Sequence, residues 1–368
     1  MNILALNWQD LTNPQAGGAE VHLEELLRRL VKKGHKVTLF CSSFPGAASE
    51  ETIQGIRIIR RGSRFNFNLV APIHLRRLVQ SEKFDLMIED INKIPFYTPL
   101  YLDIPTLVVV PHLFSTTVFK EINFLLGFYI YFSERPLVKV YKKCKFNVIS
   151  ESTADDIARR GIPRENISIV HCGIDSGIYN YDASVKKYER PTILYLGRVK
   201  KYKSVDHLIM AFKKVLEKVP QAELKIVGNG DYLPKLKTLA EDLEISGKVQ
   251  FPGYVSLEEK VEIIRRSHVA VYPSLKEGWG LTNIEANACG TTVIAANVPG
   301  LKDSVIDNTT GLLYPYGNIE QMTEKILAVI GDEEARKRLE KGGLEWAARF
   351  NWDRAGEEFM AVMEKIGK

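Results

Sequence analysis

Residues 1–40, MNILALNWQDLTNPQAGGAEVHLEELLRRLVKKGHKVTLF, decide the fold class of this chain. Residues 2–6 form a short apolar run, which is typical of a buried strand. Leucines and a valine then recur on one helical face across residues 19–33, and Gly34 ends the periodicity. A second apolar run follows at residues 37–40. Because a strand, a helix and a strand in this order form a βαβ unit, the segment predicts a parallel sheet covered by helices.

The same alternation continues along both halves of the chain. Further strands of the first half are expected at residues 56–60, 84–88, 106–110, 146–149 and 167–170. Residues 179–190 (YNYDASVKKYER) are polar and charged, which is typical of a linker. Strands of the second half are expected at residues 191–196, 224–227, 249–251, 269–272 and 292–296. We therefore predict an α/β protein with two tandem Rossmann-like, doubly wound domains, residues 1–183 and 184–348, facing each other across a cleft.

The residue content excludes several classes of protein. A chain of 368 residues that is 45% hydrophobic and 26% charged has enough apolar side chains for two globular cores. No apolar run approaches the roughly 18 residues of a membrane span. The longest run is residues 124–132, and residue 1 leads directly into a strand instead of a signal sequence. We therefore expect a cytoplasmic protein.

Charge and cysteine content limit the partners and cofactors. With 50 basic and 45 acidic residues, the formal charge of +5 gives mild attraction to anions but falls short of a nucleic-acid binder. The cysteines lie far apart and form no Cys-x-x-Cys pair, which predicts reduced thiols instead of disulfides or a zinc site. They are Cys41, Cys144, Cys172 and Cys289. We therefore expect no structural metal and no nucleic-acid partner.

Glycine-containing segments follow three of the predicted strands. They are residues 14–18 (PQAGG), 197–203 (GRVKKYK) and 277–280 (EGWG). Glycines at such places let backbone N–H groups approach a phosphate, and the dipole of a following helix favours its negative charge. Each segment alone is more often a simple turn. Because doubly wound domains bind ligands at the carboxyl ends of their strands, the three segments together predict one anion site in the cleft.

Charged side chains accompany the second and third segments. Arg198 can grip a diphosphate with two donors, and Lys203 adds a point charge near the start of a helix that Ser204 would cap. Glu285 lies about one turn into the helix predicted at 281–289, where a carboxylate can accept two ribose hydroxyls. Glu277, ahead of the turn, would meet a sugar. The alternative interpretation of each residue, taken singly, is a solvated surface charge.

The order and spacing of these residues resemble the family 4 retaining glycosyltransferases, which are two-domain GT-B enzymes that use nucleotide-sugar donors. The resemblance covers nearly the full chain. Its segments are Gly17-Gly-Ala-Glu-x-His22, Gly197-Arg198 with Lys203, Val227-Gly-Asn-Gly230, Phe251-x-Gly253, residues 277–290 and Gly311-Leu-Leu313. It implies a GT-B fold in which a last helix, residues 349–368, packs back on the first domain.

The resemblance also implies a role for each matching residue. The two cations would bind the donor pyrophosphate, the first amides of the following helix the sugar and β-phosphate, and Glu285 the ribose. Glu277 would be catalytic and contact a sugar hydroxyl, while Val255 would border the base. The implied donor-binding residues are Gly17, Gly18, Arg198, Lys203, Val255, Glu277, Gly278, Trp279, Gly280, Leu281, Thr282 and Glu285. Trp279 departs from the family pattern, which usually has Phe there.

Two histidines lie in or near matching segments. His112 follows the predicted strand at 106–110, where the family has a catalytic histidine near the anomeric centre and the 6-hydroxyl of the sugar. Without the resemblance, a lone histidine at a strand end is more often a packed, hydrogen-bonded residue. His22 lies in the first helix, and we expect it to be structural.

The implied reaction moves a hexose from a UDP- or GDP-sugar to a hydroxyl of a glycan, lipid-linked or small-molecule acceptor. Retention at the anomeric carbon, by front-face attack, follows from the resemblance alone. The sequence contains no Asp-x-Asp. The cations and helix amides would therefore stabilise the leaving diphosphate without a metal or other cofactor. The alternatives are a GT-B sugar-nucleotide epimerase or phosphorylase, although no lysine is marked for pyridoxal phosphate, and a non-catalytic relative that binds nucleotide sugars.

The acceptor side is less defined. Asp90, Asn92 and Lys93 follow a predicted strand of the first domain and are expected to contact the acceptor, although the acidic pair at 89–90 is equally typical of a solvated turn. Residues 119–146 are rich in aromatics and lysines. They suggest peripheral contact with the inner face of the cell membrane, but a helix that packs its apolar side inward is the more common arrangement. The sequence leaves the oligomeric state open.

Overall fold

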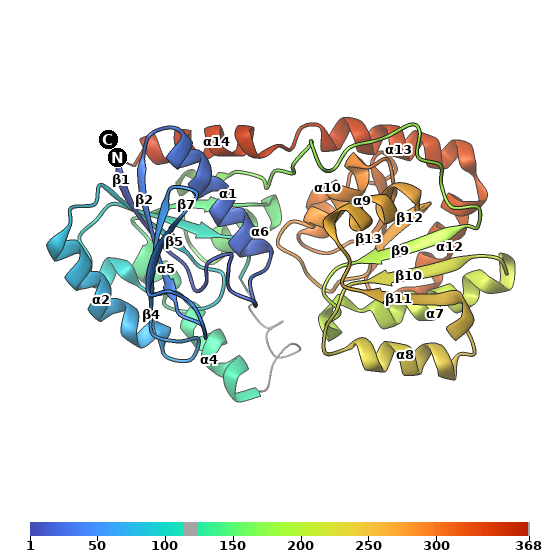
Figure 1. Ribbon diagram of the computed structural model, residues 1–368, viewed down its shortest axis with the longest axis horizontal. Coiled ribbons are helices and arrows are strands. Elements are labelled where there is room, and N and C mark those ends of the chain that lie inside the picture. Colours follow the sequence, from blue (N-terminus) through green and yellow to red (C-terminus); the bar gives the residue numbers. More distant parts are fainter. Residues whose placement is uncertain (114–123, 367–368) are drawn as a thin grey trace. The chain divides into compact units, whose positions relative to one another are not determined.

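The fold is that of a computed structural model, which describes residues 1–113 and 124–366 (Figure 1). The chain forms two compact units. Unit 1 contains Met1–Gly173 and Trp352–Lys368, and unit 2 contains Ile174–Asn351. The division falls before the expected boundary at 183, because Ile178 and Tyr179 already pack against the core of unit 2.

Unit 1 is built on an eight-stranded sheet with the order β3-β4-β2-β1-β5-β6-β7-β8. Its strands are β1 (Asn2–Leu6), β2 (Lys36–Ser42), β3 (Glu50–Ile53), β4 (Ile56–Arg61), β5 (Leu86–Asp90), β6 (Thr106–Val110), β7 (Lys145–Val148) and β8 (Ile167–Ile169). All neighbours are parallel except β3 and β4. The sequence did not predict β3, a half-exposed edge strand. It pairs through a tight hairpin in which Gln54 and Gly55 have positive φ.

The helices of unit 1 are α1 (Gly18–Lys32), α2 (Phe67–Ser81), η1 (Thr98–Leu100), α4 (Phe124–Glu134), α5 (Leu137–Tyr141), α6 (Glu151–Arg159), η3 (Arg164–Asn166) and α14 (Trp352–Glu364). The last helix, α14, packs along α1, far away in the sequence (Figure 1). Gly356 allows this close approach, because a Cβ there would lie 2.8 Å from Cβ of Arg29. Arg29 also pairs with Asp353 at 3.0 Å.

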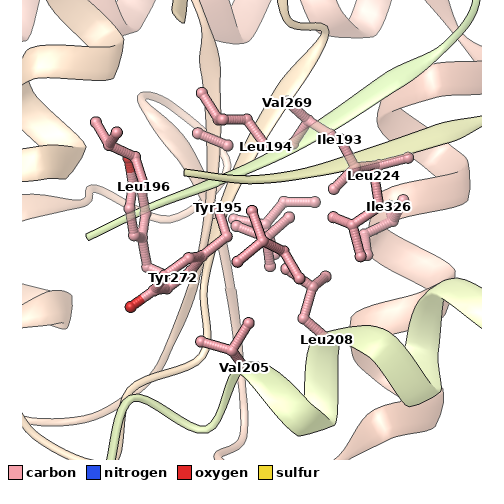
Figure 2. Close-up of a cluster of buried hydrophobic side chains, with 14 of the residues drawn as sticks. Ile193, Leu194, Tyr195, Leu196, Val205, Leu208, Leu224, Val269, Tyr272 and Ile326 are labelled. Atoms are coloured by element: carbon pink, nitrogen blue, oxygen red, sulfur yellow. The ribbon is translucent and has the colours of Figure 1, made fainter. Parts of the chain in front are cut away.

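Unit 2 is built on a six-stranded, wholly parallel sheet with the order β11-β10-β9-β12-β13-β14. Its strands are β9 (Thr192–Leu196), β10 (Glu223–Val227), β11 (Val249–Gly253), β12 (Val269–Tyr272), β13 (Thr292–Ala296) and β14 (Gly311–Tyr314). Figure 2 shows its core, where side chains of β9 meet Leu208 of the following helix and Ile326 of a later one.

The helices of unit 2 are η4 (Lys201–Lys203), α7 (Val205–Lys218), α8 (Leu233–Asp242), η5 (Ser246–Lys248), α9 (Leu257–Arg266), α10 (Leu281–Ala288), α11 (Leu301–Ser304), α12 (Ile319–Gly331) and α13 (Glu333–Ala347). Ser256 caps α9, since its hydroxyl accepts a hydrogen bond from the Glu259 amide at 3.1 Å. Ser204 takes the predicted N-cap position of α7, but its side chain does not cap the helix. Ser204 has a φ of 51°, makes no side-chain cap bond, and contacts the Tyr316 hydroxyl instead.

Each sheet reverses its winding direction once. In unit 1 the chain moves outward from β1 to β2 and then returns to β5, on the other side of β1; in unit 2 it moves from β9 to β10 and returns to β12. Both units are therefore doubly wound, and the predicted α/β architecture with two Rossmann-like domains is confirmed. Among the helices of the described residues, none has the length and apolar character needed to span a membrane.

Candidate functional site

The switch point of unit 2 lies between β9 and β12, and the loops after its strands are tied together by backbone contacts. The Gly197 amide donates to the Val227 carbonyl at 3.0 Å, and the Gly228 amide to the Gly253 carbonyl at 2.8 Å. A Cβ on Gly228 would lie 2.0 Å from the Gly197 oxygen, and one on Gly230 would lie 1.9 Å from the Val199 oxygen. Close packing of loops therefore explains these glycines without any ligand.

Two predicted residues meet at this switch point. Lys203 is the last residue of η4, and its ammonium is ion-paired with the Glu277 carboxylate, which follows β12. The two loops are also joined by a hydrogen bond from the Leu275 amide to the Tyr202 carbonyl at 2.9 Å. Burial lowers the pKa of Lys203, but Glu277 and Tyr202 raise it, and the pKa ends above its usual value. Lys203 is therefore a permanent cation.

Arg198 follows β9 directly, and its side chain is exposed. A hydrogen bond holds its backbone, because the buried Tyr195 hydroxyl donates to the Arg198 carbonyl at 2.9 Å. The backbone of Arg198 is therefore held in place, while its side chain is exposed to solvent. This arrangement suits the binding of an external anion.

The EGWG turn is rigid. Gly280 caps α10 with a φ of 75°, and a Cβ there would lie 2.8 Å from the Ser304 hydroxyl. On the other side, a Cβ on Gly300 would lie 2.1 Å from the Glu277 carbonyl oxygen. The Trp279 ring is buried and packs edge-on against Phe350 at 5.3 Å. The first amides of α10, those of Leu281 and Thr282, are consequently held in place with no intrahelical acceptor of their own.

Glu285 is buried in α10 and is not a helix-surface acid. Its carboxylate accepts a hydrogen bond from the Lys260 ammonium at 2.9 Å. Lys260, on α9, also donates to the Tyr179 hydroxyl at 2.7 Å. The sequence did not predict Lys260, because nothing in a helix of mixed charges marks one lysine as the partner of a distant glutamate. Val255 lies just before α9 and packs partly against the core of unit 2.

The switch point of unit 1 lies between β1 and β5. Gly17 caps α1, and its amide already donates to the Glu20 carboxylate at 2.7 Å. Gly18 is different, because no atom lies within 4 Å of the place where its Cβ would stand. Asn92, after β5, donates to Asn7 at 2.9 Å and to Glu20 at 3.3 Å. These bonds bring the predicted acceptor-side residue Asn92 next to the helix start at Gly17 and Gly18.

Glu89 and Asp90 are the last residues of β5, and both are completely buried. The alternative interpretation of a solvated acidic turn is therefore wrong, because the strand continues to position 90. Glu89 accepts hydrogen bonds from the Phe96 amide at 2.8 Å and from Tyr141. The oxygens of Asp90 have no hydrogen-bond partner among the described residues. Burial, reinforced by the charge of Glu20, raises the pKa of Asp90 well above its usual range.

The remaining predicted residues of unit 1 lie near the same sheet edge. Lys93 sits over the Trp8 ring at 5.9 Å. His112 is half-buried and follows β6, next to Pro111, whose carbonyl accepts from the Thr153 hydroxyl at 3.1 Å. His22 is buried 6.2 Å from the Trp352 ring, and burial lowers its pKa to about 4. A neutral, buried His22 supports a structural role. The part of the 119–146 segment up to residue 123 lies outside the described residues.

The described residues provide no metal site of the usual kind, since no group of three or more His, Cys, Asp and Glu side chains is arranged to hold an ion. All four cysteines are free. The groups that can hold a charged ligand are the cations and helix amides of unit 2 and the open helix start of unit 1. Each set is preformed within its own unit.

Comparisons with known proteins agree with this arrangement. A family model described as glycosyl transferases group 1 matches residues 180–346, and the model for Glycosyltransferase Family 4 matches residues 16–177. The chain is a family 4-like glycosyltransferase with the GT-B fold. The predicted family is thereby confirmed, whereas the role of each site residue stays a prediction.

Two curated relatives and one solved structure illustrate the range of this glycosyltransferase's relatives. A GDP-mannose-dependent alpha-(1-6)-phosphatidylinositol monomannoside mannosyltransferase of Mycobacterium tuberculosis is 25% identical over 367 residues, 92% of each chain. A D-inositol 3-phosphate glycosyltransferase of Streptomyces bingchenggensis is 32% identical over 225 residues, covering 56% of this chain and 49% of that protein. Sucrose-phosphate synthase from Thermosynechococcus elongatus matches with a TM-score of 0.83 and 20% identity over 99% of each chain, which shows the fold alone.

Proposed function

We propose that this glycosyltransferase moves a hexose from a nucleoside diphosphate sugar to a hydroxyl of a glycan, lipid-linked or small-molecule acceptor. The observation that carries the proposal is the exposed Arg198 after β9, whose charge acts on Lys203, together with the Lys203–Glu277 pair at the switch point of unit 2. Breaking the bond between a sugar and a diphosphate builds negative charge on the leaving group. Fixed cations and helix amides stabilise that charge in the transition state.

The charged residues of the unit 2 site have separate roles in this proposal. Arg198 grips two phosphate oxygens, and Lys203 supplies a point charge beside it. When the phosphate takes over part of the pairing of Lys203, a Glu277 oxygen becomes available to accept a hydrogen bond from a sugar hydroxyl. Glu285 accepts the ribose hydroxyls, and Lys260 holds its carboxylate in the required orientation. These roles need no movement of the backbone within unit 2.

The proposed reaction retains the configuration of the anomeric carbon. The bond from that carbon to the phosphate oxygen breaks, a bond to the acceptor oxygen forms on the same face, and the acceptor proton passes to the leaving phosphate. His112 of unit 1 would lie near the anomeric centre. No metal or other cofactor is required, since protein cations and amides carry out the charge stabilisation. The name of the Mycobacterium tuberculosis relative favours GDP as the nucleotide, and UDP is the alternative.

Arg198→Ala tests the proposal most directly. We expect transfer to slow by about 100-fold, as on the loss of one transition-state donor, while the unfolding free energy changes by less than about 0.5 kcal/mol, as for an exposed side chain. Lys200→Ala is the matched control, because Lys200 is a nearby surface cation that pairs with Asp231 at 2.8 Å. The donor is first found by a thermal-shift screen of UDP-, GDP- and ADP-sugars, and transfer is then measured with EDTA present.

Three results would contradict the proposal. Equal losses of rate in the Arg198 and Lys200 variants would remove the special role of Arg198. Loss of transfer in EDTA would show that a divalent ion is needed. The absence of binding heat with every nucleoside diphosphate would exclude a nucleotide-sugar transferase altogether.

We further propose that unit 1 contacts an anionic lipid surface, where a lipid-linked acceptor would lie. Three exposed apolar residues are spaced four residues apart: Phe65, two residues before α2, and Leu69 and Ile73 within it. They are 89%, 72% and 55% exposed. These three side chains face solvent instead of the core. The basic side chains Arg61 and Arg64 precede it. An apolar stripe with flanking cations is typical of an interfacial helix.

Leu69→Asp tests the lipid contact. We expect it to reduce cosedimentation with phosphatidylglycerol vesicles several-fold, because it places an acid in the apolar stripe. Ile306→Asp, at an exposed apolar residue of unit 2, is the control. Equal vesicle binding by the wild type and both variants would contradict this contact, without bearing on the donor site.

A further inference from the structure

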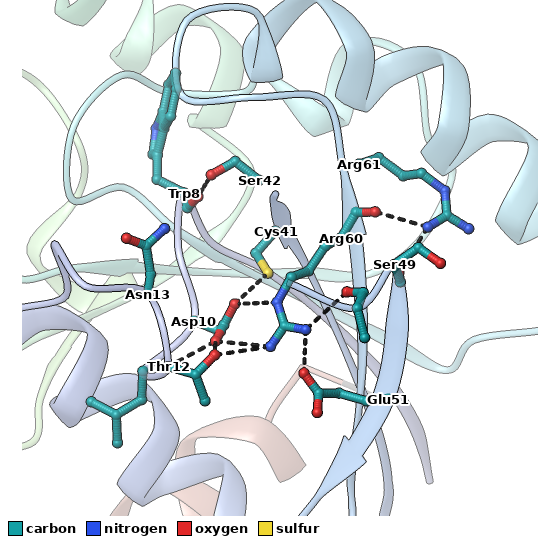
Figure 3. Close-up of polar contacts among 12 residues, drawn as sticks. Trp8, Asp10, Thr12, Asn13, Cys41, Ser42, Ser49, Glu51, Arg60 and Arg61 are labelled. Atoms are coloured by element: carbon teal, nitrogen blue, oxygen red, sulfur yellow. Dashed lines mark hydrogen bonds and ion pairs between the residues drawn. The ribbon is translucent and has the colours of Figure 1, made fainter. Parts of the chain in front are cut away.

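Arg60, the residue before the last of β4, is completely buried, and every polar face of its guanidinium is bound (Figure 3). Its Nε donates to Asp10 at 2.7 Å, and one terminal nitrogen donates to the other oxygen of Asp10 at 3.1 Å. The same nitrogen donates to the Thr12 hydroxyl at 3.0 Å. The second terminal nitrogen donates to the Ala48 carbonyl at 3.0 Å and pairs with Glu51. The head group thus joins β4 to a loop and to the strand beside it.

Asp10 is the centre of the loop's own hydrogen bonds. It is buried, and besides Arg60 it accepts from the Thr12 amide at 2.9 Å and from the Thr12 hydroxyl. The Cys41 thiol contacts it at 3.4 Å. Burial raises the pKa of Asp10, but the bonds from Arg60 and Thr12 lower it, and the net pKa is below its ordinary value. Asp10 is therefore a carboxylate whose bonds hold both the loop and β4.

The loop that Arg60 holds connects β1 to α1 and ends at Gly17 and Gly18. A second contact holds the same loop from the helix side, since the Leu11 amide donates to the Glu24 carboxylate at 3.1 Å. The loop is therefore fixed between β4 and α1. Its far end is the helix start with open space at Gly18.

A fully buried ion pair is a poor source of stability. The desolvation of two charges roughly offsets their attraction, and well-packed apolar residues of similar size stabilise a fold as well or better. What the pair gives is geometry, because the planar guanidinium accepts partners in few orientations. A bidentate bond to Asp10, combined with the bond to Thr12, fixes both the distance and the orientation of the loop relative to β4.

We propose that Arg60 is a positioning residue, which acts through Asp10 and Thr12 to hold the β1–α1 loop so that the amide end at Gly18 meets the donor. The inference rests on the proposed function and on the donor contact that the family resemblance implies for Gly17 and Gly18. It assigns to Arg60 no contact with any substrate. A displacement of about 1 Å in such a helix start is enough to lower the rate by up to about 100-fold.

The test removes both charges and so leaves no unpaired ion in the core. The double variant Arg60→Met with Asp10→Asn keeps an oxygen for the Thr12 amide but loses the bonds to β4. The matched control is Arg57→Met, also on β4, because Arg57 pairs with Glu50 and Glu82 at 2.6 and 2.9 Å, outside the loop. We expect the melting temperature of the double variant to stay as close to wild type as that of the control.

Two readouts follow the loop and the reaction separately. Hydrogen exchange at residues 7–18 should become faster in the double variant and stay unchanged in the control. The KM for the donor sugar should rise about 10- to 100-fold. Arg60→Lys keeps the positive charge but loses the planar guanidinium that binds both oxygens of Asp10. Its KM for the donor sugar should lie between those of the wild type and the double variant. A purely structural role would lower the melting temperature and the amount of active enzyme while leaving KM unchanged.

Unchanged exchange and unchanged KM in the double variant would overturn the proposal. If the double variant melts early, Asp10→Asn alone, measured below the lower melting temperature, decides by the same two readouts. If the wild type neither binds a nucleoside diphosphate nor transfers a sugar, the proposed function fails. The exchange comparison then still decides whether Arg60 holds the loop.

Discussion

The switch points of the two units share one topology but hold their polar groups in different ways. In unit 2 the charges form ion pairs, as in Lys203–Glu277 and Lys260–Glu285, and the Arg198 side chain is exposed. In unit 1 the polar groups at the end of β5 are buried, and the pKa of Asp90 is raised well above its usual range. The sheet topology thus determines where a site forms, while burial determines which charges it offers. Unit 2 offers fixed cations to an anion, whereas the two acids that end β5 in unit 1 are buried.

The largest expected difference between the units concerns their glycines. In unit 2, Gly228→Ala places a Cβ 2.0 Å from the Gly197 oxygen at a φ of 129°. We expect a loss of about 4 kcal/mol or more of unfolding free energy, because two backbones must separate. In unit 1, Gly18→Ala meets open space and should change stability by less than about 0.5 kcal/mol while slowing transfer. Urea unfolding and a transfer assay measure the two effects.

Two results would contradict the glycine comparison. A Gly228 variant as stable as the wild type would show that the loops after β9 and β10 can separate at little cost. A Gly18 variant with full activity would show that the open space at the start of α1 is not used by a ligand.

The second prediction concerns the loss of stability of unit 1 at low pH. Burial lowers the pKa of His22 in the folded chain to about 4, below its ordinary value of 6.5. The unfolded chain therefore binds the proton more readily, and stability falls as the pH drops from about 6.5 toward 4. The loss from this one residue should reach about 3 kcal/mol. Hydrogen exchange of β1 and α1, measured in urea at pH 7 and pH 4.5, would report it.

His22→Gln should remove that part of the acid sensitivity from unit 1. His74→Gln, at a half-buried histidine of α2, serves as the control and should leave most of it. If the His22 variant responds to acid like the wild type, another group carries the sensitivity of this unit, and Asp10, whose pKa is lowered in the fold, would be the next residue to test.

Much of this fold is predictable from local sequence, because buried parallel strands are continuous apolar runs. β1, β6, β12 and β13 have the same limits in the sequence and in the structure. The sequence did not predict β3, because an exposed edge strand has no continuous apolar run. β5 was placed too early, since Glu89 and Asp90 look like the beginning of a loop although they end the strand.

The sequence could name individual candidate residues of the site but not the partners that they contact. Glycines at helix starts and cations after strands are visible in the sequence, so the members of the unit 2 site could be named. Their partners could not, because Lys260 and Glu285, or Arg60 and Asp10, come together only through the tertiary fold. The same limit explains Asp90, whose burial depends on segments far away in the chain.

The smallest expected effect tests whether the paired charges of unit 2 are preformed for a ligand. Glu285→Ala should weaken nucleoside diphosphate affinity by about 1–3 kcal/mol, as on the loss of a charge-assisted hydrogen bond. Lys260→Met should weaken it too if Lys260 acts by orienting Glu285, and the double variant should then be no worse than Glu285→Ala alone. Calorimetric titration of the wild type and the three variants measures this coupling. Additive losses would mean that Lys260 contacts the nucleotide independently, and unchanged affinity in the Glu285 variant would exclude the ribose contact.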